Sequence, residues 1–272
     1  MRKIVVPVSF GVNSATAARY AASLGLVTDS EIRLVYILQS PSVFSHHPMP
    51  GFVFGEMRDN GYNLLNSLRD ELSRLTGGKV QLTIDMEIGQ IDQRLKAYCS
   101  KHKPFLVVMG ASESVPGKDF GAVHALEAMK RLPYPLLVIP AKASFHGAPK
   151  VLIACDREDI FTGLSPILPF LKELHELLGT RFQIVHIVAD GESFEDTRRE
   201  YEAWKKELEA FQPGLQLIRQ SDVEEGINDY LENHAADWLL VLPKKHSPLE
   251  FHKSRAKDIV LHCSLTVLSV HE

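Results

Sequence analysis

Residues 104–140 (PFLVVMGASESVPGKDFGAVHALEAMKRLPYPLLVIP) predict the unit from which the rest of the fold can be built. Phe105–Met109 and Leu136–Ile139 are continuous apolar runs, which is typical of parallel strands that are covered on both faces. Between them lie a glycine-containing loop and a helix predicted to begin at Asp119 or Phe120. Open α/β sheets bind ligands at the carboxyl ends of their strands, and helix N-terminal amides favour anions. This loop is therefore the first candidate binding site, although a strand-to-helix turn also needs glycines without any ligand.

The composition of the 272-residue chain, with 45% hydrophobic and 24% charged residues, is that of a globular protein. A net charge of -4 offers no electrostatic basis for binding nucleic acid or an anionic membrane. No apolar run approaches the length of a bilayer span, and the N-terminus is better interpreted as a first strand than as a signal peptide. Cys99, Cys155 and Cys263 lie far apart without CxxC spacing, so we expect reduced thiols, a cytoplasmic protein and no metal site.

The same order of elements is predicted twice along the chain, with a polar Gly- and Pro-containing linker at 141–149 between the copies. In the first copy, residues 1–140, we expect strands at 3–9, 32–38, 80–88, 105–109 and 136–139. In the second, residues 150–272, we expect strands at 150–156, 182–188, 215–218, 238–242 and 265–270. Helices are predicted between successive strands, including one at 56–75 and one at 249–260. Such alternation requires right-handed crossovers, and it predicts an α/β fold of two repeated doubly wound, five-stranded parallel-sheet sandwiches of Rossmann-like type.

Four local details complete the prediction. Asn13 or Ser14 is expected to cap the first helix. Ser40–Gly55 is expected to be a long loop that serves as a lid or contact surface, because it is rich in Pro, Gly and His. The ligand crevice is expected at the carboxyl ends of the first and fourth strands of each copy. One side of the helix at 56–75 is expected to be apolar through Leu64, Leu65, Leu68, Leu72 and Leu75.

Residues 3–25 (KIVVPVSFGVNSATAARYAASLG) and 107–140 resemble the universal stress protein family in its tandem two-domain form. The second half is similar through VLIACD at 151–156, FQIVHIV at 182–188 and the segment 238–270. The resemblance covers nearly the whole chain, and it implies the universal-stress-protein type of the fold predicted above. It does not specify one activity.

In members of this family that bind nucleotide, an Asp that ends the first strand approaches the adenosine, and a Gly-x-x-Gly-(nine residues)-Gly-Ser/Thr loop wraps the phosphates. The resemblance therefore implies cofactor-binding positions at Ser9, Gly110, Gly121 and Ala122. This chain departs from the pattern, because Ser9 stands at the Asp position, Glu113 replaces the second glycine and Ala122 replaces the hydroxyl residue. A carboxylate at Glu113 repels phosphates, and the loss of the hydroxyl removes a hydrogen bond.

The second half retains Asp156 at the end of its first strand but has lost the glycines of the loop. Residues 243–248 (PKKHSP) replace the glycine-rich start, and Lys253-Ser254 stands where Gly-Ser is expected. Without glycine the backbone cannot form the same amide nest, although lysine side chains can still attract an anion. Asp156, Lys245 and Ser254 are the candidate contacts in this half.

Two hypotheses of different classes stay open. The first is a non-catalytic cytoplasmic stress-response regulator that binds ATP or another adenine nucleotide. The alternative is a ligand-free protein-interaction module whose nucleotide sites are degenerate. We assign no catalytic residue, since neither GxSxG nor GxxxxGK[ST] occurs and no base, nucleophile or metal cluster supports a nucleotide hydrolase. The family resemblance implies intramolecular domain pairing through the last strands, and further association into a homo-oligomer stays open.

Overall fold

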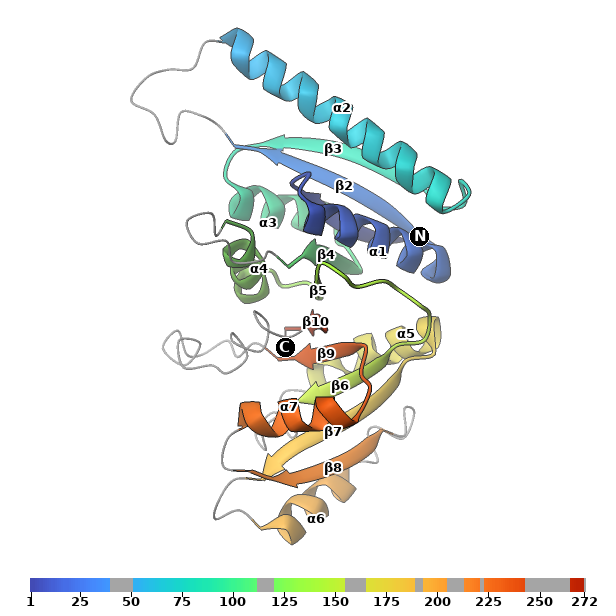
Figure 1. Cartoon of the computed structure of the whole chain (residues 1–272), viewed down its shortest axis with the longest axis vertical. Helices are drawn as coiled ribbons and strands as arrows, with labels where there is room; N and C mark the ends of the chain where they lie inside the picture. The colour runs from blue at the N-terminus through green and yellow to red at the C-terminus, as the bar shows by residue number, and fades with distance from the viewer. Residues whose placement is uncertain are drawn as a thin grey trace, which may run out of the picture. The chain divides into compact units, whose positions relative to one another are not determined.

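Parallel strands alternate with helices along the chain (Figure 1). The computed structural model describes residues 1–39, 51–111, 120–154, 165–188, 193–204, 213–220, 223–242 and 265–271. The chain divides into two compact units, Met1–Phe145 and His146–Glu272. In the described parts of the chain, no helix combines the length and the apolar character that crossing a membrane requires.

The first unit holds five parallel strands in the order β3-β2-β1-β4-β5. The strands β4 and β5 are continuous apolar runs and are almost wholly buried, as the absence of alternation predicts. The elements are β1 (Arg2–Val8), α1 (Val12–Thr28), β2 (Ser30–Leu38), α2 (Gly51–Leu75), β3 (Leu82–Ile88), α3 (Ile91–His102), β4 (Leu106–Gly110), α4 (Phe120–Arg131) and β5 (Leu136–Ile139).

Helices cover both faces of this sheet. α1 packs on β1, β2, β4 and β5 and also contacts α2, whereas α3 contacts α4 (Figure 1). Right-handed crossovers explain this arrangement, because the connections from β1 to β3 and those from β3 to β5 run in opposite directions across the sheet. The connections therefore diverge between β1 and β4. This point is where doubly wound sheets open a crevice.

The second unit has the corresponding strand order, β10-β9-β6-β7-β8, and its pairs are also parallel. The predicted doubly wound α/β fold is thus confirmed for each sheet. The helix expected at 249–260 lies outside the described residues. The elements are β6 (Lys150–Ala154), a short 3-10 helix η3 (Ser165–Ile167), α5 (Leu168–Leu178), β7 (Arg181–Val188), α6 (Phe194–Trp204), β8 (Gly214–Arg219), α7 (Val223–Asn233), β9 (Trp238–Val241) and β10 (Thr266–Ser269).

The start of α1 differs from the prediction. Gly11 is the N-cap and makes no side-chain capping bond, so the expectation that Asn13 or Ser14 caps the helix was wrong. Both side chains are used elsewhere. The Oγ of Ser14 accepts a hydrogen bond from the backbone N–H of Ser9 at 3.0 Å, and the Asn13 amide donates to the carbonyl of Ala111. These tertiary bonds tie the start of α1 to the ends of β1 and β4.

The helix α2 also differs from the prediction at its start and along one side. It begins at Gly51, so the expectation of a loop was wrong for 51–55, while residues 40–50 lie outside the described part. Leu65, Leu68 and Leu72 are buried as expected, but Leu64 and Leu75 are exposed. Positions 64 and 75 fall on the rim of the apolar stripe, because each residue advances about 100° around the helix.

Candidate ligand-binding site

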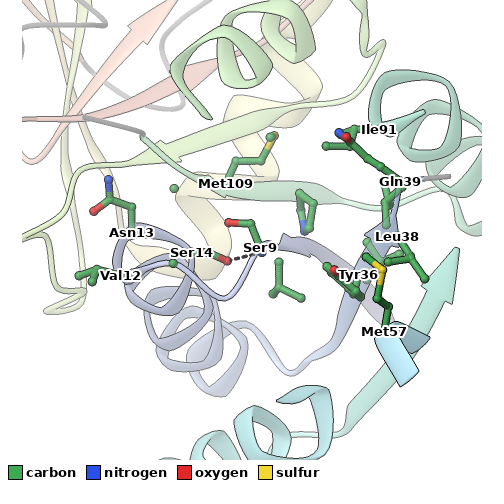
Figure 2. A pocket seen from close by; sticks show the side chains of 16 residues that line it. Ser9, Val12, Asn13, Ser14, Tyr36, Leu38, Gln39, Met57, Ile91 and Met109 are labelled. Carbon is green, nitrogen blue, oxygen red and sulfur yellow. Dashed lines mark hydrogen bonds between the residues drawn. The ribbon is translucent and has the colours of Figure 1, made fainter. Parts of the chain in front are cut away.

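A cavity of about 620 Å³ opens at the carboxyl ends of β1, β2 and β4 (Figure 2). The turn from β1 into α1 forms one side of it, and the end of β2 forms another. Met57 of α2, Ile91 of α3 and Met109 of β4 complete the lining. Its volume is within the range of cavities that hold small molecules, about 300–1,000 Å³. The cavity thus lies where the diverging crossovers predict a ligand.

The turn from β1 to α1 is held in an unusual conformation. Phe10 has a φ of 60°, in the left-handed region that a bulky side chain rarely adopts. Its ring packs against the ring of Tyr36 with 4.8 Å between centroids. A backbone in this region costs on the order of 1–3 kcal/mol unless surrounding contacts enforce it, and such residues gather at binding sites. The aromatic contact and the bond between Ser9 and Ser14 keep the turn open toward the cavity.

Tyr36 is enclosed from two sides, and this placement defines one wall of the cavity. Phe10 covers the Tyr36 ring from the β1–α1 turn, and Gly61 approaches the same ring from α2. A Cβ built on Gly61 would lie 2.9 Å from the Tyr36 ring, closer than real Cβ atoms come. Glycine at this position therefore lets α2 lie close to the end of β2.

Gly110 at the end of β4 has a structural role that does not depend on a ligand. A Cβ on Gly110 would lie 2.4 Å from the backbone oxygen of Asn13, so only glycine lets the start of α1 approach β4 this closely. Gly110 also lines the cavity. Its proposed role in approaching a nucleotide stays a prediction.

The lining of the cavity is mostly apolar, and its polar members are neutral. Hydroxyl and amide groups come from Ser9, Ser14, Tyr36, Asn13 and Gln39. In the described part of the chain, the lining includes no Asp, Glu, His, Cys, Lys or Arg. The hydroxyl and amide groups can donate and accept hydrogen bonds to a bound molecule.

The structure brings two of the predicted site residues together. Ser9 and Gly110 line the same cavity from adjacent strands. Gly121 and Ala122 belong to the first turn of α4, whose side chains are not described here. Asp156, Lys245 and Ser254 lie outside the described residues.

Sequence reasoning missed Tyr36, Gln39, Met57 and Ile91, which also line the cavity. For Tyr36 and Gln39 a signal was available, because β2 neighbours β1 and its carboxyl end reaches the same edge of the sheet. Met57 and Ile91 reach the cavity through the packing of two helices. No local motif indicates that placement.

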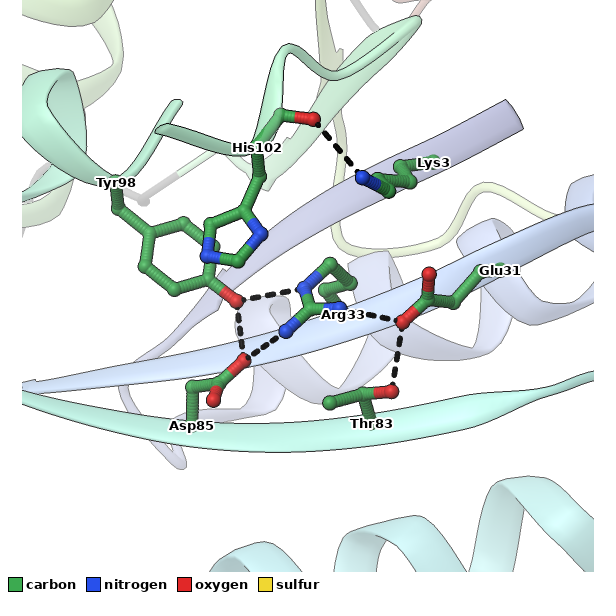
Figure 3. A network of polar contacts seen from close by, with 7 residues as sticks. All are labelled: Lys3, Glu31, Arg33, Thr83, Asp85, Tyr98 and His102. Carbon is green, nitrogen blue, oxygen red and sulfur yellow. Dashed lines mark hydrogen bonds and ion pairs between the residues drawn. The ribbon is translucent and has the colours of Figure 1, made fainter. Parts of the chain in front are cut away.

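A second polar cluster lies between β2, β3 and α3 (Figure 3). The Arg33 guanidinium donates to Glu31 at 2.6 Å, to Asp85 at 2.8 Å and to the hydroxyl of Tyr98 at 2.9 Å. Thr83 donates to Glu31 at 2.7 Å, and Tyr98 donates to Asp85. Burial, together with the hydrogen bond to Asp85, raises the pKa of Tyr98, which therefore stays a neutral donor. With these mutual contacts, the cluster is a cross-link between the three elements.

A family model described as the universal stress protein family matches residues 1–140, just over half of the chain. No protein of curated function matches the sequence significantly.

Solved structures resemble the whole chain. A universal stress protein from Archaeoglobus fulgidus DSM 4304 is 12% identical, with 99% of this chain and 96% of that chain covered and a TM-score of 0.74. A protein from Pseudomonas aeruginosa UCBPP-PA14, provisionally named a universal stress protein, is 13% identical, with 100% and 93% covered and a TM-score of 0.62. At such identities the likeness shows a shared fold. Together with the family match, it shows that this chain belongs to the universal stress protein family.

Proposed function

We propose that this protein is a tandem universal stress protein, a non-catalytic cytoplasmic regulator that binds an adenine nucleotide in the cavity of its first unit. One observation carries the proposal: a cavity of about 620 Å³ lies at the carboxyl ends of β1 and β4, where the connections of the parallel sheet diverge. The adenine part of the proposal rests on the family resemblance of residues 3–25 and 107–140.

The chemistry of the lining is compatible with a base and a sugar. Tyr36, Met57 and Ile91 offer apolar surface to a heterocycle, while Ser9 and Asn13 offer groups that can hydrogen-bond to hydroxyls or ring nitrogens. The described lining includes no carboxylate, imidazole, amine or thiol. We therefore propose that binding changes the protein's interactions with partners, rather than that the ligand is turned over.

An isothermal titration with ATP and AMP tests the proposal, with Ser9→Trp as the blocking variant. Ser9 is exposed and lines the cavity, so an indole there fills the binding space without replacing a buried core residue. Val27→Trp is the matched control, because Val27 is an exposed residue at the other end of α1. We expect binding to the wild type and to Val27→Trp, and none to Ser9→Trp. The absence of heat and of a thermal shift at millimolar nucleotide would reject nucleotide binding.

A second candidate function, a protein-interaction module, is favoured by the exposed apolar residues of α2. Phe52 is 71% exposed, and Met57, Tyr62 and Leu64 are exposed as well. Aromatic residues and Met are enriched at protein–protein interfaces. If this function is the main one, Phe52→Ser abolishes partner binding in cell extracts, whereas Ser9→Trp leaves it intact. Loss of partner binding in Ser9→Trp alone would instead favour the ligand-dependent regulator.

A further inference from the structure

We propose that residues 141–145 form a strap that holds the first turn of α1 where a ligand contacts it, and that a bound ligand in turn holds the strap on α1. This inference rests on the proposed function and specifies how that site is regulated. The strap follows β5 and ends the first unit at Phe145, and the chain then continues into the second unit. Release of the strap therefore carries the state of the cavity to the connection between the units.

One side of the strap lies against α1. Its first, third and fifth residues are half-buried, whereas Lys142 and Ser144 between them are exposed. The ring of Phe145 meets the ring of Tyr20 edge-on, with 5.5 Å between the centroids. Tyr20 lies in the middle of α1 and is only 4% exposed. Because aromatic pairs favour this edge-to-face geometry, the contact attaches the end of the strap to the helix.

A second contact of the strap lies one turn of α1 closer to the cavity. The hydroxyl of Thr16 donates to the carbonyl of Ala141 at 3.3 Å and to the carbonyl of Val12 at 3.1 Å. Val12 belongs to the first turn of α1 and lines the cavity. One hydroxyl group, sharing its hydrogen between two acceptors, therefore joins the start of the strap to a residue of the cavity wall.

The first turn of α1 is also tied to the strap through the sheet. Asn13, which lines the cavity (Figure 2), donates from its side-chain amide to the carbonyl of Ala111. The N–H of Ala111 donates to the carbonyl of Ile139 at 2.7 Å. Ile139 ends β5, and Pro140 joins it to the strap. These contacts close a ring that runs from Asn13 through the ends of β4 and β5 and along the strap back to Thr16.

This ring makes the strap and a ligand act on the same element. Rigid secondary elements carry coupling between two sites that each contact them. A ligand that contacts Val12 or Asn13 favours the position of α1 in which the ring is closed, and a docked strap favours the same position. Ligand binding and strap docking must then strengthen each other by the same factor, which is about 5–150-fold in typical coupled proteins.

Trypsin cleavage of the full-length protein after Lys142 measures release of the strap, because a protease cuts the opened form of a segment. Cleavage after Lys79, an exposed residue between α2 and β3, is the internal control. We expect saturating ATP to slow cleavage after Lys142 at least about fivefold relative to cleavage after Lys79. In Ser9→Trp, whose cavity is blocked, ATP should leave both rates unchanged.

The Phe145→Ser variant tests the reverse direction. It removes the ring that packs on Tyr20, so we expect faster cleavage after Lys142 and a Kd for ATP that is raised at least about fivefold. Thr16→Val removes only the hydroxyl that reaches Ala141 and should act in the same direction, which decides the question if Phe145→Ser does not fold. Phe52→Ser is the matched control, because it removes an exposed phenylalanine that is not among the described lining residues.

The outcomes separate the inference from the proposed function. If Phe145→Ser is cleaved faster after Lys142 but binds ATP as tightly as the wild type, the strap does not act on the cavity and the inference is wrong, whereas nucleotide binding stands. Equal slowing by ATP after Lys142 and Lys79 would show a general stabilisation of the first unit and would also overturn the inference. If the wild type binds no ATP, the proposed function fails and the inference fails with it.

Discussion

Arg33 is a nearly buried cation that two carboxylates and a tyrosine hydroxyl surround (Figure 3). Its side chain is 14% exposed, and that of Glu31 is 8% exposed. Burying such an ion pair contributes little net free energy, because desolvation of both charges offsets their attraction. Removing one partner is strongly destabilising, because the other charge is then buried without compensation. Arg33 therefore holds β2, β3 and α3 together, because separating these elements would leave buried charges unpaired.

Arg33→Met is expected to destabilise the first unit by about 3–5 kcal/mol, because it leaves Glu31 without its cation in a buried place. The matched control is Arg69→Met, which removes an exposed pair with Asp70 and should cost less than about 1 kcal/mol. Amide hydrogen exchange of β2 and β3 measures the effect. Tryptophan fluorescence would not, since Trp204 and Trp238 both lie in the second unit. Equal costs for the two variants would contradict this account of the cluster.

Gly110→Ala is expected to destabilise the first unit by about 1–3 kcal/mol, because the new methyl group would overlap the Asn13 carbonyl and force α1 away from β4. Gly55→Ala is the control. Nothing lies within 4 Å of its added Cβ, and the residue is in a helix, so it should be neutral or stabilising by up to about 1 kcal/mol. Hydrogen exchange in α1 measures both. A neutral Gly110→Ala would show that β4 and α1 are not packed this closely.

At the scale of elements, α2 shows how one helix serves both the core and the site. Leu65, Leu68 and Leu72 bury its inner face, and Gly61 lets it approach Tyr36. Met57, one turn before Gly61, then lines the cavity. Because burial of the inner face sets the height of the helix over the sheet, it also sets where Met57 lies.

Neighbouring leucines of α2 provide a sharp comparison. Leu65 is fully buried, whereas Leu64 is 40% exposed. We expect Leu65→Ala to cost about 2–5 kcal/mol through lost burial and a residual cavity, and Leu64→Ala to cost less than about 1 kcal/mol. Hydrogen exchange in α2 and β3 measures both values. If Leu64→Ala proved the more costly variant, the rotation of the helix described here would be wrong.

At the scale of the whole molecule, every lining residue that the structure describes belongs to the first unit, within Pro7–Gly110. We therefore expect the site not to need the covalent connection to the second unit. The boundary between the units falls between Phe145 and His146. Gly147 follows it, with a φ of 106° and nothing near its missing side chain, so this segment tolerates an insertion.

A protease site inserted between His146 and Gly147 tests this independence. After cleavage, we expect ATP affinity to stay within about twofold of that of the uncut insertion variant, because no described lining residue is displaced. Isothermal titration before and after cleavage provides the measurement, and the uncut variant is the control for the insertion itself. Loss of binding on cleavage alone would show that the site depends on the connection to the second unit.

Local patterns in the chain were sufficient to predict the parallel strands, their alternation with helices and the crevice that holds Ser9 and Gly110. Short apolar runs without alternation, bounded by turn residues, are typical of strands buried on both faces, and right-handed crossovers then restrict where the connections diverge. The contacts of Asn13 and Ser14, the enclosure of Tyr36 and the cross-link at Arg33 could not be predicted in this way. They join residues that are distant along the chain, and they depend on how closely helices and strands pack, which no periodicity encodes.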